Sequence, residues 1–366
     1  MLSTAATVAA ACWLLLLLLP WRPWSAREQL SADETSAKRD LSAITVLIPA
    51  RDEAETIAAT VRAAASQGDN LRIIVIDDES GDGTAQLAAA AGAEVIAGQA
   101  LPHGWSGKLW ALQQGLEQVR SDYILQLDAD IQLAPGMLNA LHDKISRQQL
   151  TLVSIMALLP TTNIWQRVLL PAYVWFFKLL YPFALVNSSN RRFAAAAGGC
   201  ILLRRQALLD MGTYRALRGA IIDDCTLATA IKRQGGRIWL GLSRAVISCR
   251  SSDSPGEIGK LISRTAFTQL RHSSLLLLLT SMAMLVLFWA PVLALLFAAT
   301  GGKLIAALAI ACMLVCYLPL LRFYRLSSIY ALLLPLIAVF YLQHTWLSAI
   351  HHWRGRGAEW KQRHYP

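Results

Sequence analysis

Acidic residues stand in four clusters along the middle of this 366-residue chain. In chain order they are Glu53, Asp77-Asp78, Asp128-Ala129-Asp130 and Asp223-Asp224. Two carboxylates separated by one residue at a strand end can converge on a divalent cation, and hard oxygen ligands favour Mg²⁺ or Mn²⁺ over zinc. The six cysteines show no Cys-x-x-Cys pair and no zinc-finger spacing with histidine. We therefore expect a Mg²⁺ or Mn²⁺ site at Asp128 and Asp130, completed by an anionic ligand such as a nucleotide diphosphate.

The elements that must position these carboxylates can be predicted from local patterns. Three clusters follow or end runs of strand-forming residues at 44–48, 73–76 and 123–127, and a further strand is expected at 94–97. Helix-forming stretches at 53–65, 84–91 and 108–119 alternate with these strands. Such alternation predicts an α/β domain with a mostly parallel sheet and helices on both faces. Because the carboxyl ends of parallel strands share one edge of the sheet, the acidic clusters should meet there.

Apolar residues are segregated along the chain, which is 55% hydrophobic with a mean hydropathy of +0.41. An unbroken apolar run at 8–19 is followed by Trp and Arg residues, which favours an uncleaved membrane anchor within residues 1–26 over a cleaved signal peptide. Three further runs at 275–299, 304–321 and 326–347 approach the roughly 20 residues that cross a bilayer. Residues 273–350 are therefore expected to form transmembrane helices.

The net charge of +10, from 34 basic and 24 acidic residues, has an explanation that does not require nucleic-acid binding. Basic residues gather near the ends of the apolar runs, as cytoplasmic residues should: Arg22, Arg27, Lys38, Arg39, Arg264, Arg271, Arg322 and Arg325. We expect a multi-pass protein of a cell inner membrane whose domain at 27–272 is cytoplasmic. The basic tail at 351–366, with Arg354, Arg356, Lys361 and Arg363, conflicts with three spans after a cytoplasmic domain. Either one run is re-entrant or the tail departs from the rule.

An apolar stretch at 165–186 lies between the third and fourth acidic clusters. Pro171, Pro182, Arg167 and Lys178 interrupt it, which favours a pair of helices on the membrane surface over a transmembrane helix. A buried core helix is the other interpretation. An interfacial pair would bring the hydroxyl of a membrane lipid to the domain without extracting the lipid.

Several segments, in order and spacing, resemble family 2 glycosyltransferases with the GT-A fold. They are Val46–Glu53, Asp77–Thr84, Lys108–Gly115 and Asp128–Asp130 for the nucleotide-sugar half, and Gly198–Cys200, Arg204-Arg205 and Asp223–Leu227 for the acceptor half. The resemblance covers about residues 41–272. The flanking apolar runs are similar to those of membrane-bound enzymes that glycosylate lipids, near ceramide glucosyltransferases and enzymes of hopanoid and carotenoid synthesis. The loop at 101–108 is most similar to the hopanoid-associated group.

The resemblance implies a Rossmann-like GT-A domain and a donor site. Pro49, Glu53 and Asp78 would lie along the nucleotide, with Asp78 reading the base. Lys108 would neutralise diphosphate charge, although a surface lysine at a helix start is an equal alternative. Asp128 would hold the sugar or ribose side and Asp130 the metal, unless the two share it.

Asp224 fills the position that the family uses as general base. In an inverting displacement, a carboxylate removes the proton of an acceptor hydroxyl while the nucleotide diphosphate leaves. The family's usual Glu-Asp pair is Asp223-Asp224 here, which leaves open which carboxylate is the base, and an acidic pair at a helix N-terminus is the structural alternative. A base implies a hydroxyl acceptor, because a phosphate acceptor is already ionised.

A second departure concerns the stretch before the first C-terminal apolar run. Processive synthases and ceramide-type enzymes carry Gln/Arg-x-x-Arg-Trp there, whereas this chain reads Thr268-Gln269-Leu270-Arg271-His272. Arg271 would contact the diphosphate or anchor the following span, and both interpretations stay open. The missing tryptophan counts against a processive polysaccharide synthase.

Together these features predict an inverting, metal-dependent enzyme of hexosyltransferase type. It would move one sugar from a nucleotide-sugar donor, expected to be UDP-linked, to a hydroxyl of a membrane lipid. A hopanoid is the favoured acceptor by resemblance alone. The alternatives are a processive polysaccharide synthase and a non-catalytic membrane scaffold that binds nucleotide sugars.

Overall fold

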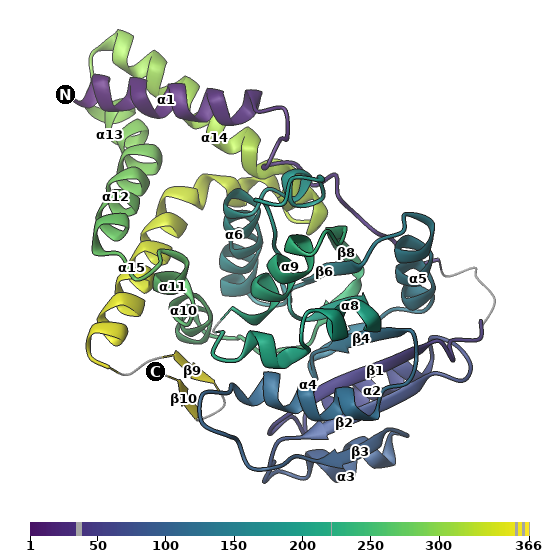
Figure 1. Ribbon diagram of the computed structural model, residues 1–366. Coiled ribbons are helices and arrows are strands. Elements are labelled where there is room, and N and C mark those ends of the chain that lie inside the picture. The colour runs from purple at the N-terminus through teal and green to yellow at the C-terminus, as the bar shows by residue number, and fades with distance from the viewer. Residues whose placement is uncertain (34–38, 221, 356–357, 361–362, 366) are drawn as a thin grey trace. The chain divides into compact units, whose positions relative to one another are not determined.

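The computed structural model describes residues 1–33, 39–220, 222–355, 358–360 and 363–365 (Figure 1). Lys38, Arg356 and Lys361, which the sequence analysis counted among the basic residues, lie outside the described residues. The chain forms two compact units. One comprises Met1–Arg27, Thr161–Ala184 and Ser252–Pro366, and the other Glu28–Pro160 and Leu185–Ser251. We call the second the sheet unit and the first the helical unit.

The sheet unit is built on an eight-stranded sheet with the order β3-β2-β1-β4-β7-β6-β8-β5. The strands are β1 (Ile44–Ala50), β2 (Arg72–Asp77), β3 (Glu94–Ala97), β4 (Tyr123–Leu127), β5 (Ile131–Leu133), β6 (Leu152–Leu158), β7 (Cys200–Arg204) and β8 (Ile238–Ser248). Strands β3, β2, β1 and β4 pair in parallel, as do β6 and β8. Strand β7 is antiparallel to β4 and β6, and β5 is antiparallel to β8. The predicted α/β fold with a mostly parallel, Rossmann-like sheet is confirmed, and its second half is mixed.

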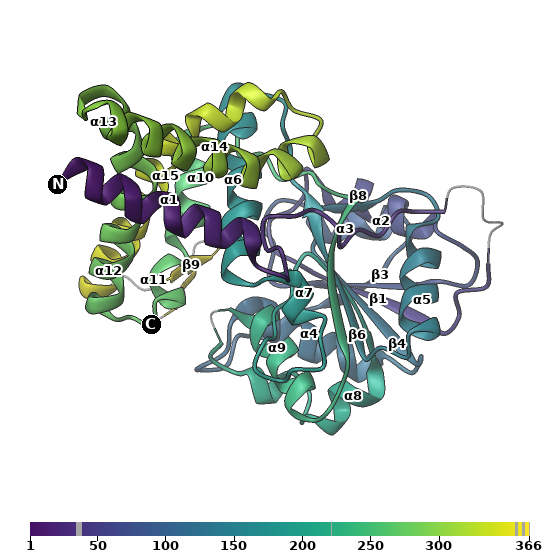
Figure 2. The same ribbon diagram turned by 90° about the horizontal axis from the view of Figure 1, so that it is seen from above.

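Helices cover both faces of the parallel half of this sheet (Figure 2). The helical segments of the unit are α2 (Ile57–Ala65), α3 (Thr84–Ala90), α4 (Gly107–Gln118), α5 (Met137–Arg147), α8 (Arg205–Asp210), the 3-10 turn η1 (Tyr214–Leu217) and α9 (Asp223–Arg233). Val46 of β1 belongs to the same core cluster as Val61 of α2. The adjacent Leu47 lies beside Gly115 of α4, where an added Cβ would be 3.1 Å from its side chain. Since neighbouring strand residues point to opposite faces, α2 and α4 cover opposite sides of β1, which is buried along its whole length.

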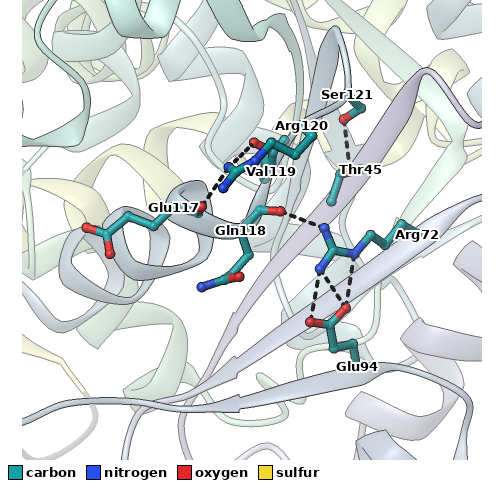
Figure 3. Close-up of polar contacts among 8 residues, drawn as sticks. All are labelled: Thr45, Arg72, Glu94, Glu117, Gln118, Val119, Arg120 and Ser121. Carbon is teal, nitrogen blue, oxygen red and sulfur yellow. Dashed lines mark hydrogen bonds and ion pairs between the residues drawn. The ribbon is translucent and has the colours of Figure 1, made fainter.

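The amino ends of these parallel strands are joined by polar contacts (Figure 3). The Arg72 guanidinium at the start of β2 makes a bidentate ion pair with Glu94 of β3, through Nε at 3.0 Å and Nη2 at 2.8 Å. Its Nη1 donates to the Gln118 carbonyl at the end of α4 at 2.6 Å. The Thr45 and Ser121 hydroxyls, 2.8 Å apart, link β1 to the turn before β4. These contacts occupy the edge opposite the acidic clusters.

The helical unit contains three segments that are long and apolar enough to cross a membrane, at Ser274–Phe297, Thr300–Phe323 and Ser328–Trp353. They agree with the three predicted C-terminal spans. The elements are α1 (Leu2–Leu18), α6 (Ile164–Leu180), α7 (Phe183–Val186), α10 (Pro255–Ser263), α11 (Ala266–Gln269), α12 (Ser274–Met284), the π-helical turn η2 (Leu285–Trp289), α13 (Ala290–Phe297), α14 (Thr300–Phe323), η3 (Ser328–Leu333), α15 (Leu334–Trp353), β9 (Ala358–Trp360) and β10 (Arg363–Tyr365). Helix α7 straddles the boundary between the units. The predicted N-terminal anchor forms α1, a shorter apolar helix of 17 residues.

The predicted interfacial segment at 165–186 forms α6 and α7. Trp175, near the middle of α6, is fully buried, and its indole Nε1 donates to the Cys316 carbonyl of α14 at 3.0 Å. Near the helix ends, Trp165 and Leu180 are about half exposed. The middle of α6 is therefore packed inside the helical unit, and apolar side chains are exposed near both of its ends. Its location at a membrane surface stays a prediction.

Candidate active site

The carboxyl ends of β1, β2 and β4 lie side by side, and an acidic cluster follows each. In the parallel register, Ala50 of β1 is opposite Asp77 of β2, and Leu47 is opposite Gln126 of β4. The predicted nucleotide-binding residue Pro49 is within β1, opposite Ile76. The sheet therefore gathers the first three acidic clusters on one edge, as the sequence pattern predicts.

The loops after β1 and β2 bind each other at this edge. The Glu53 N–H donates to the Thr84 hydroxyl at 2.8 Å, and the Ala54 N–H donates to the Asp82 carboxylate at 2.9 Å. These bonds hold residues 53–56 as a turn, so the helix expected from Glu53 begins only at Ile57. The helix start was wrong because polar side chains of a distant loop satisfy N–H groups that would otherwise favour a helical first turn.

Asp78, the predicted base reader, is 3% exposed directly after β2. The Asp78 N–H donates to the Ala50 carbonyl at 2.8 Å, and the Arg51 guanidinium donates to the Asp78 carbonyl. The backbone on both sides of Asp78 is thus fixed by the neighbouring loop. A backbone held this firmly gives the Asp78 side chain a defined starting point, which suits a residue that reads a ligand by hydrogen bonds.

The Asp128-Ala129-Asp130 turn is held by backbone contacts from three parts of the sheet unit. The Asp128 N–H donates to the Gly199 carbonyl at 3.0 Å, the Thr60 hydroxyl to the Ala129 carbonyl at 2.8 Å, and the Cys249 N–H to the Asp130 carbonyl at 2.7 Å. Distant segments therefore fix the backbone that carries the two carboxylates. No local signal in this tripeptide encodes that arrangement.

Lys108, at the start of α4, joins the third and fourth acidic clusters. Its Nζ lies 2.6 Å from Oδ1 of Asp128 and 4.0 Å from Oδ2 of Asp223, and it donates to the Gly198 carbonyl at 3.3 Å. Only 18% of the Lys108 side chain is exposed, and this burial disfavours its charged form. The carboxylates of Asp128, Asp223 and Asp224 outweigh this effect and raise the pKa of Lys108 above its usual value. The lysine is therefore a fixed cation in the middle of the acidic group.

Asp224 begins α9 beside this cation. Its Oδ1 accepts a hydrogen bond from the Cys225 N–H at 2.7 Å. Burial and then the negative charge of Asp223 raise the pKa of Asp224 to about 6, although Lys108 acts in the opposite direction. An added Cβ at Gly198 would lie 3.1 Å from Oδ2 of Asp224 and 3.3 Å from Nζ of Lys108, so the Gly198 backbone passes close to both charges. A carboxylate with a pKa near neutrality can accept a proton from a bound hydroxyl.

Arg250 is a site residue that the sequence analysis missed. It follows β8, and its Nε lies 3.0 Å from Oδ2 of Asp130. Burial raises the pKa of Asp130 even though Arg250 opposes that rise. The arginine is brought there by antiparallel pairing of β5 with β8, in which Ile131 is opposite Ser248. The sequence pattern that could have indicated Arg250 is a basic residue immediately after a long predicted strand. This position lies outside the motifs that carry the family resemblance.

Asp128 and Asp130 fit a divalent cation only in part. Within the described ranges, no three His, Cys, Asp or Glu side chains gather closely enough to hold a metal by themselves. The pair does offer two hard carboxylate oxygens on one turn, and Mg²⁺ is commonly bound by one or two carboxylates together with substrate phosphates and water. The residues therefore suit a cation that the protein and a diphosphate hold jointly.

Arg271, the remaining predicted site residue, belongs to the helical unit. It is exposed in the turn between α11 and α12, has a φ of 52°, and donates its N–H to the Thr268 carbonyl at 2.9 Å. Its contact with a diphosphate stays a prediction.

Comparisons with known proteins show which family part of this chain is similar to. Residues 45–212 match the family model described as Glycosyl transferase family 2. The chain is 32% identical over 129 residues to 4,4'-diaponeurosporenoate glycosyltransferase of Staphylococcus haemolyticus, covering 34% of each chain. It is 34% identical over 104 residues to undecaprenyl-phosphate 4-deoxy-4-formamido-L-arabinose transferase of Shewanella sediminis, covering 26% of this chain and 31% of that protein. The chain thus spans about a third of the length of these relatives.

A solved structure extends the similarity of fold over nearly the whole chain. The mannosyltransferase PcManGT from Pyrobaculum calidifontis, solved with GDP-Man and Mn²⁺, superimposes with a TM-score of 0.59. The match covers 96% of this chain and 99% of that one at 17% sequence identity. At that identity the similarity establishes the GT-A fold.

Proposed function

Because residues 45–212 form a glycosyl transferase family 2 domain, we propose that the chain is an inverting transferase that moves one sugar from a nucleotide-sugar donor to a hydroxyl of a membrane lipid. The observation that carries this proposal is the position of the largely buried Asp224 carboxylate, which lies with the Lys108 ammonium against the Gly198 backbone. Burial and the charge of Asp223 raise the pKa of this carboxylate to about 6. An acidic pair that only stabilises a helix start can do so while exposed to solvent, so that role does not explain why Asp224 is largely buried next to Asp223. A general base does require a pKa close to the working pH.

In the proposed reaction, Asp224 takes the proton of the acceptor hydroxyl. The hydroxyl oxygen then forms a bond to the anomeric carbon of the sugar as the bond from that carbon to the diphosphate oxygen breaks. The leaving nucleoside diphosphate keeps the electron pair, and attack from the opposite side inverts the anomeric configuration. Lys108 stabilises the charge that develops on the diphosphate. A Mg²⁺ or Mn²⁺ held by Asp128 and Asp130 would neutralise part of that charge.

The donor is proposed to lie along the loops after β1 and β2. Glu53 and Asp78 would contact the nucleoside next to Pro49, and Arg271 would contact the diphosphate from the turn before α12. A UDP-linked sugar is our preferred donor, on the resemblance noted from the sequence. This assignment can be tested by competition between UDP and GDP for the purified protein.

A lipid acceptor is supported by three apolar segments that could cross a membrane and by the names of the two relatives, a diaponeurosporenoate and an undecaprenyl-phosphate transferase. The second name raises a lipid phosphate as the alternative acceptor. A raised pKa at Asp224 favours a hydroxyl, because an ionised phosphate needs no base. Among lipids with a hydroxyl, a hopanoid remains the candidate suggested by the loop at 101–108.

The proposed arrangement places an anchor at 1–26, a cytoplasmic catalytic domain at 27–272 with its interfacial segment at 165–186, transmembrane helices at 273–350 and a basic tail at 351–366. The host membrane would be a cell inner membrane. Reporter fusions after residue 26 and at the C-terminus would test the two ends of this topology.

The decisive experiment is Asp224→Asn in the purified full-length chain, with Asp223→Asn as the matched control. We expect kcat to fall by about 10²- to 10⁴-fold in Asp224→Asn while UDP binding is retained. Asp223→Asn should be less affected, because Asp223 pairs with Lys108. Unchanged turnover in Asp224→Asn would refute the assigned base and would support the phosphate acceptor.

Two further readouts separate the remaining alternatives. Long polymeric products would support a polysaccharide synthase in place of single-sugar transfer. Binding of UDP without turnover on any lipid extract would support a non-catalytic scaffold. Mass spectrometry of lipids from a deletion strain would identify the acceptor by the one glycolipid that is lost.

A further inference from the structure

The predicted metal ligand Asp130 already has a cation of the protein as its partner. The Arg250 Nε lies 3.0 Å from its Oδ2, and the Asp130 side chain is only 9% exposed. Lys108 makes a similar ion pair with the other carboxylate of the turn, with its Nζ 2.6 Å from Oδ1 of Asp128. Each of the two carboxylates expected to bind a metal is thus neutralised by its own basic side chain.

The contact between Arg250 and Asp130 is built into the fold. The Cys249 N–H, one residue before the arginine, donates to the Asp130 carbonyl at 2.7 Å and so locks the segment after β8 onto the acidic turn. The guanidinium lies among the negative charges of Asp130, Asp128 and Glu53, which outweigh its burial and raise the pKa of Arg250. About 40% of its side chain remains exposed. The guanidinium is therefore held at Asp130 on a side chain that is partly open to solvent.

We propose that Arg250 is the internal counter-cation of Asp130 and weakens the binding of a divalent metal when no donor is present. When a donor diphosphate binds, the guanidinium pairs with the diphosphate, and the metal can then bind tightly at Asp130. This role deepens the proposed function, on which it rests. A metal ion at Asp130 and the guanidinium repel each other across a few ångströms, so binding of the metal alone is unfavourable. A diphosphate attracts both cations, and binding of metal and of donor therefore favour each other.

The proposal predicts a specific change in metal affinity. In Arg250→Gln, the Asp130 carboxylate loses its competing cation, and Mn²⁺ alone should bind at least about tenfold more tightly than to the unaltered chain. The factor by which UDP tightens Mn²⁺ binding should shrink by a similar amount, because the guanidinium no longer links the two ligands. Arg250→Lys keeps a positive charge and should retain weak Mn²⁺ binding in the absence of UDP.

Mn²⁺ binding can be measured by electron paramagnetic resonance or calorimetry on the full-length chain in detergent, with and without UDP. Arg233→Gln is the matched control, since it removes one positive charge from an exposed position in the last turn of α9. Its Mn²⁺ affinity should equal that of the unaltered chain. Thermal unfolding of each variant checks that it is folded.

Several results would overturn this role for Arg250. They are an unchanged or weaker Mn²⁺ affinity in Arg250→Gln, an equal gain in Arg233→Gln, or Arg250→Lys behaving like Arg250→Gln. If Arg250→Gln does not fold, the unaltered chain still provides a test, because Mn²⁺ binding that is insensitive to UDP contradicts the proposed coupling.

The outcome is separable from that of the proposed function. The expected Mn²⁺ behaviour in a chain that transfers no sugar would support the role of Arg250 and refute the transferase. Sugar transfer with unchanged Mn²⁺ affinity in Arg250→Gln would do the reverse.

Discussion

Replacing Lys108 by Met should move the pH dependence of sugar transfer, because Lys108 is the cation that opposes the rise in the pKa of Asp224. Both charged atoms lie close to Gly198, at 3.1 Å and 3.3 Å from the position that its Cβ would occupy. The distance between Lys108 Nζ and Asp224 Oδ2 can therefore be no greater than the sum of these two distances. Removing the charge of Lys108 must therefore change the pKa of Asp224.

The magnitude follows from that separation. An opposite charge within about 4–6 Å lowers the pKa of a carboxyl group by about one to three pH units. Without Lys108, the pKa of Asp224 should rise from about 6 to roughly 7 or higher. Asp224 acts as a base only when ionised, so kcat/KM should increase as pH rises through this pKa. At pH 6 the unaltered enzyme should be near half of its plateau value, and Lys108→Met should be at about a tenth of its own.

The assay is the initial rate of transfer at subsaturating donor, measured at constant ionic strength from about pH 5 to pH 8. Lys108→Arg is the matched control, since it retains the charge and should keep the midpoint near that of the unaltered chain. The plateau of Lys108→Met is also expected to fall, because the diphosphate loses a cation, but the midpoint is the diagnostic quantity. A midpoint that is the same in Lys108→Met and the unaltered chain would refute the electrostatic argument.

Three other predictions concern stability and local order. Gly259→Ala should lower the free energy of unfolding by about 1–3 kcal/mol in a thermal unfolding assay, because the new Cβ would overlap the His344 imidazole. Gly256→Ala, where the nearest atom to the new Cβ is 3.9 Å away, should show no such loss in the same assay. Lys232→Met should accelerate tryptic cleavage of the loop that precedes β7 several-fold, because the three N–H groups of the buried ammonium are shared among four backbone carbonyls there. An unchanged digestion pattern would contradict this role. Arg72→Met should cost less than about 1 kcal/mol in denaturant unfolding despite its bidentate ion pair, since both partners are exposed, and a larger loss would show that surface screening has been overestimated.

Local sequence patterns were sufficient to predict the parallel half of the sheet. The strands at 44–48, 73–76 and 123–127 are short, apolar and bounded by polar turns, and burial on both faces leaves few alternatives for such segments. The antiparallel half was less predictable. β7 and β8 pair with strands far away in the sequence, and pairing direction depends on how distant segments meet.

For the candidate site, the sequence by itself determined which carboxylates stand at strand ends and which apolar segments are long enough for a membrane. Those properties depend on residue type and spacing along a short stretch of chain. Only the tertiary structure decided the charge environment of each carboxylate. Lys108 meets Asp128 and Asp224 because α4 and α9 converge on one edge of the sheet, and Arg250 reaches Asp130 because β8 pairs with β5. Electrostatic interactions depend on distance through space, and folding sets that distance between residues that are up to 120 positions apart in the sequence.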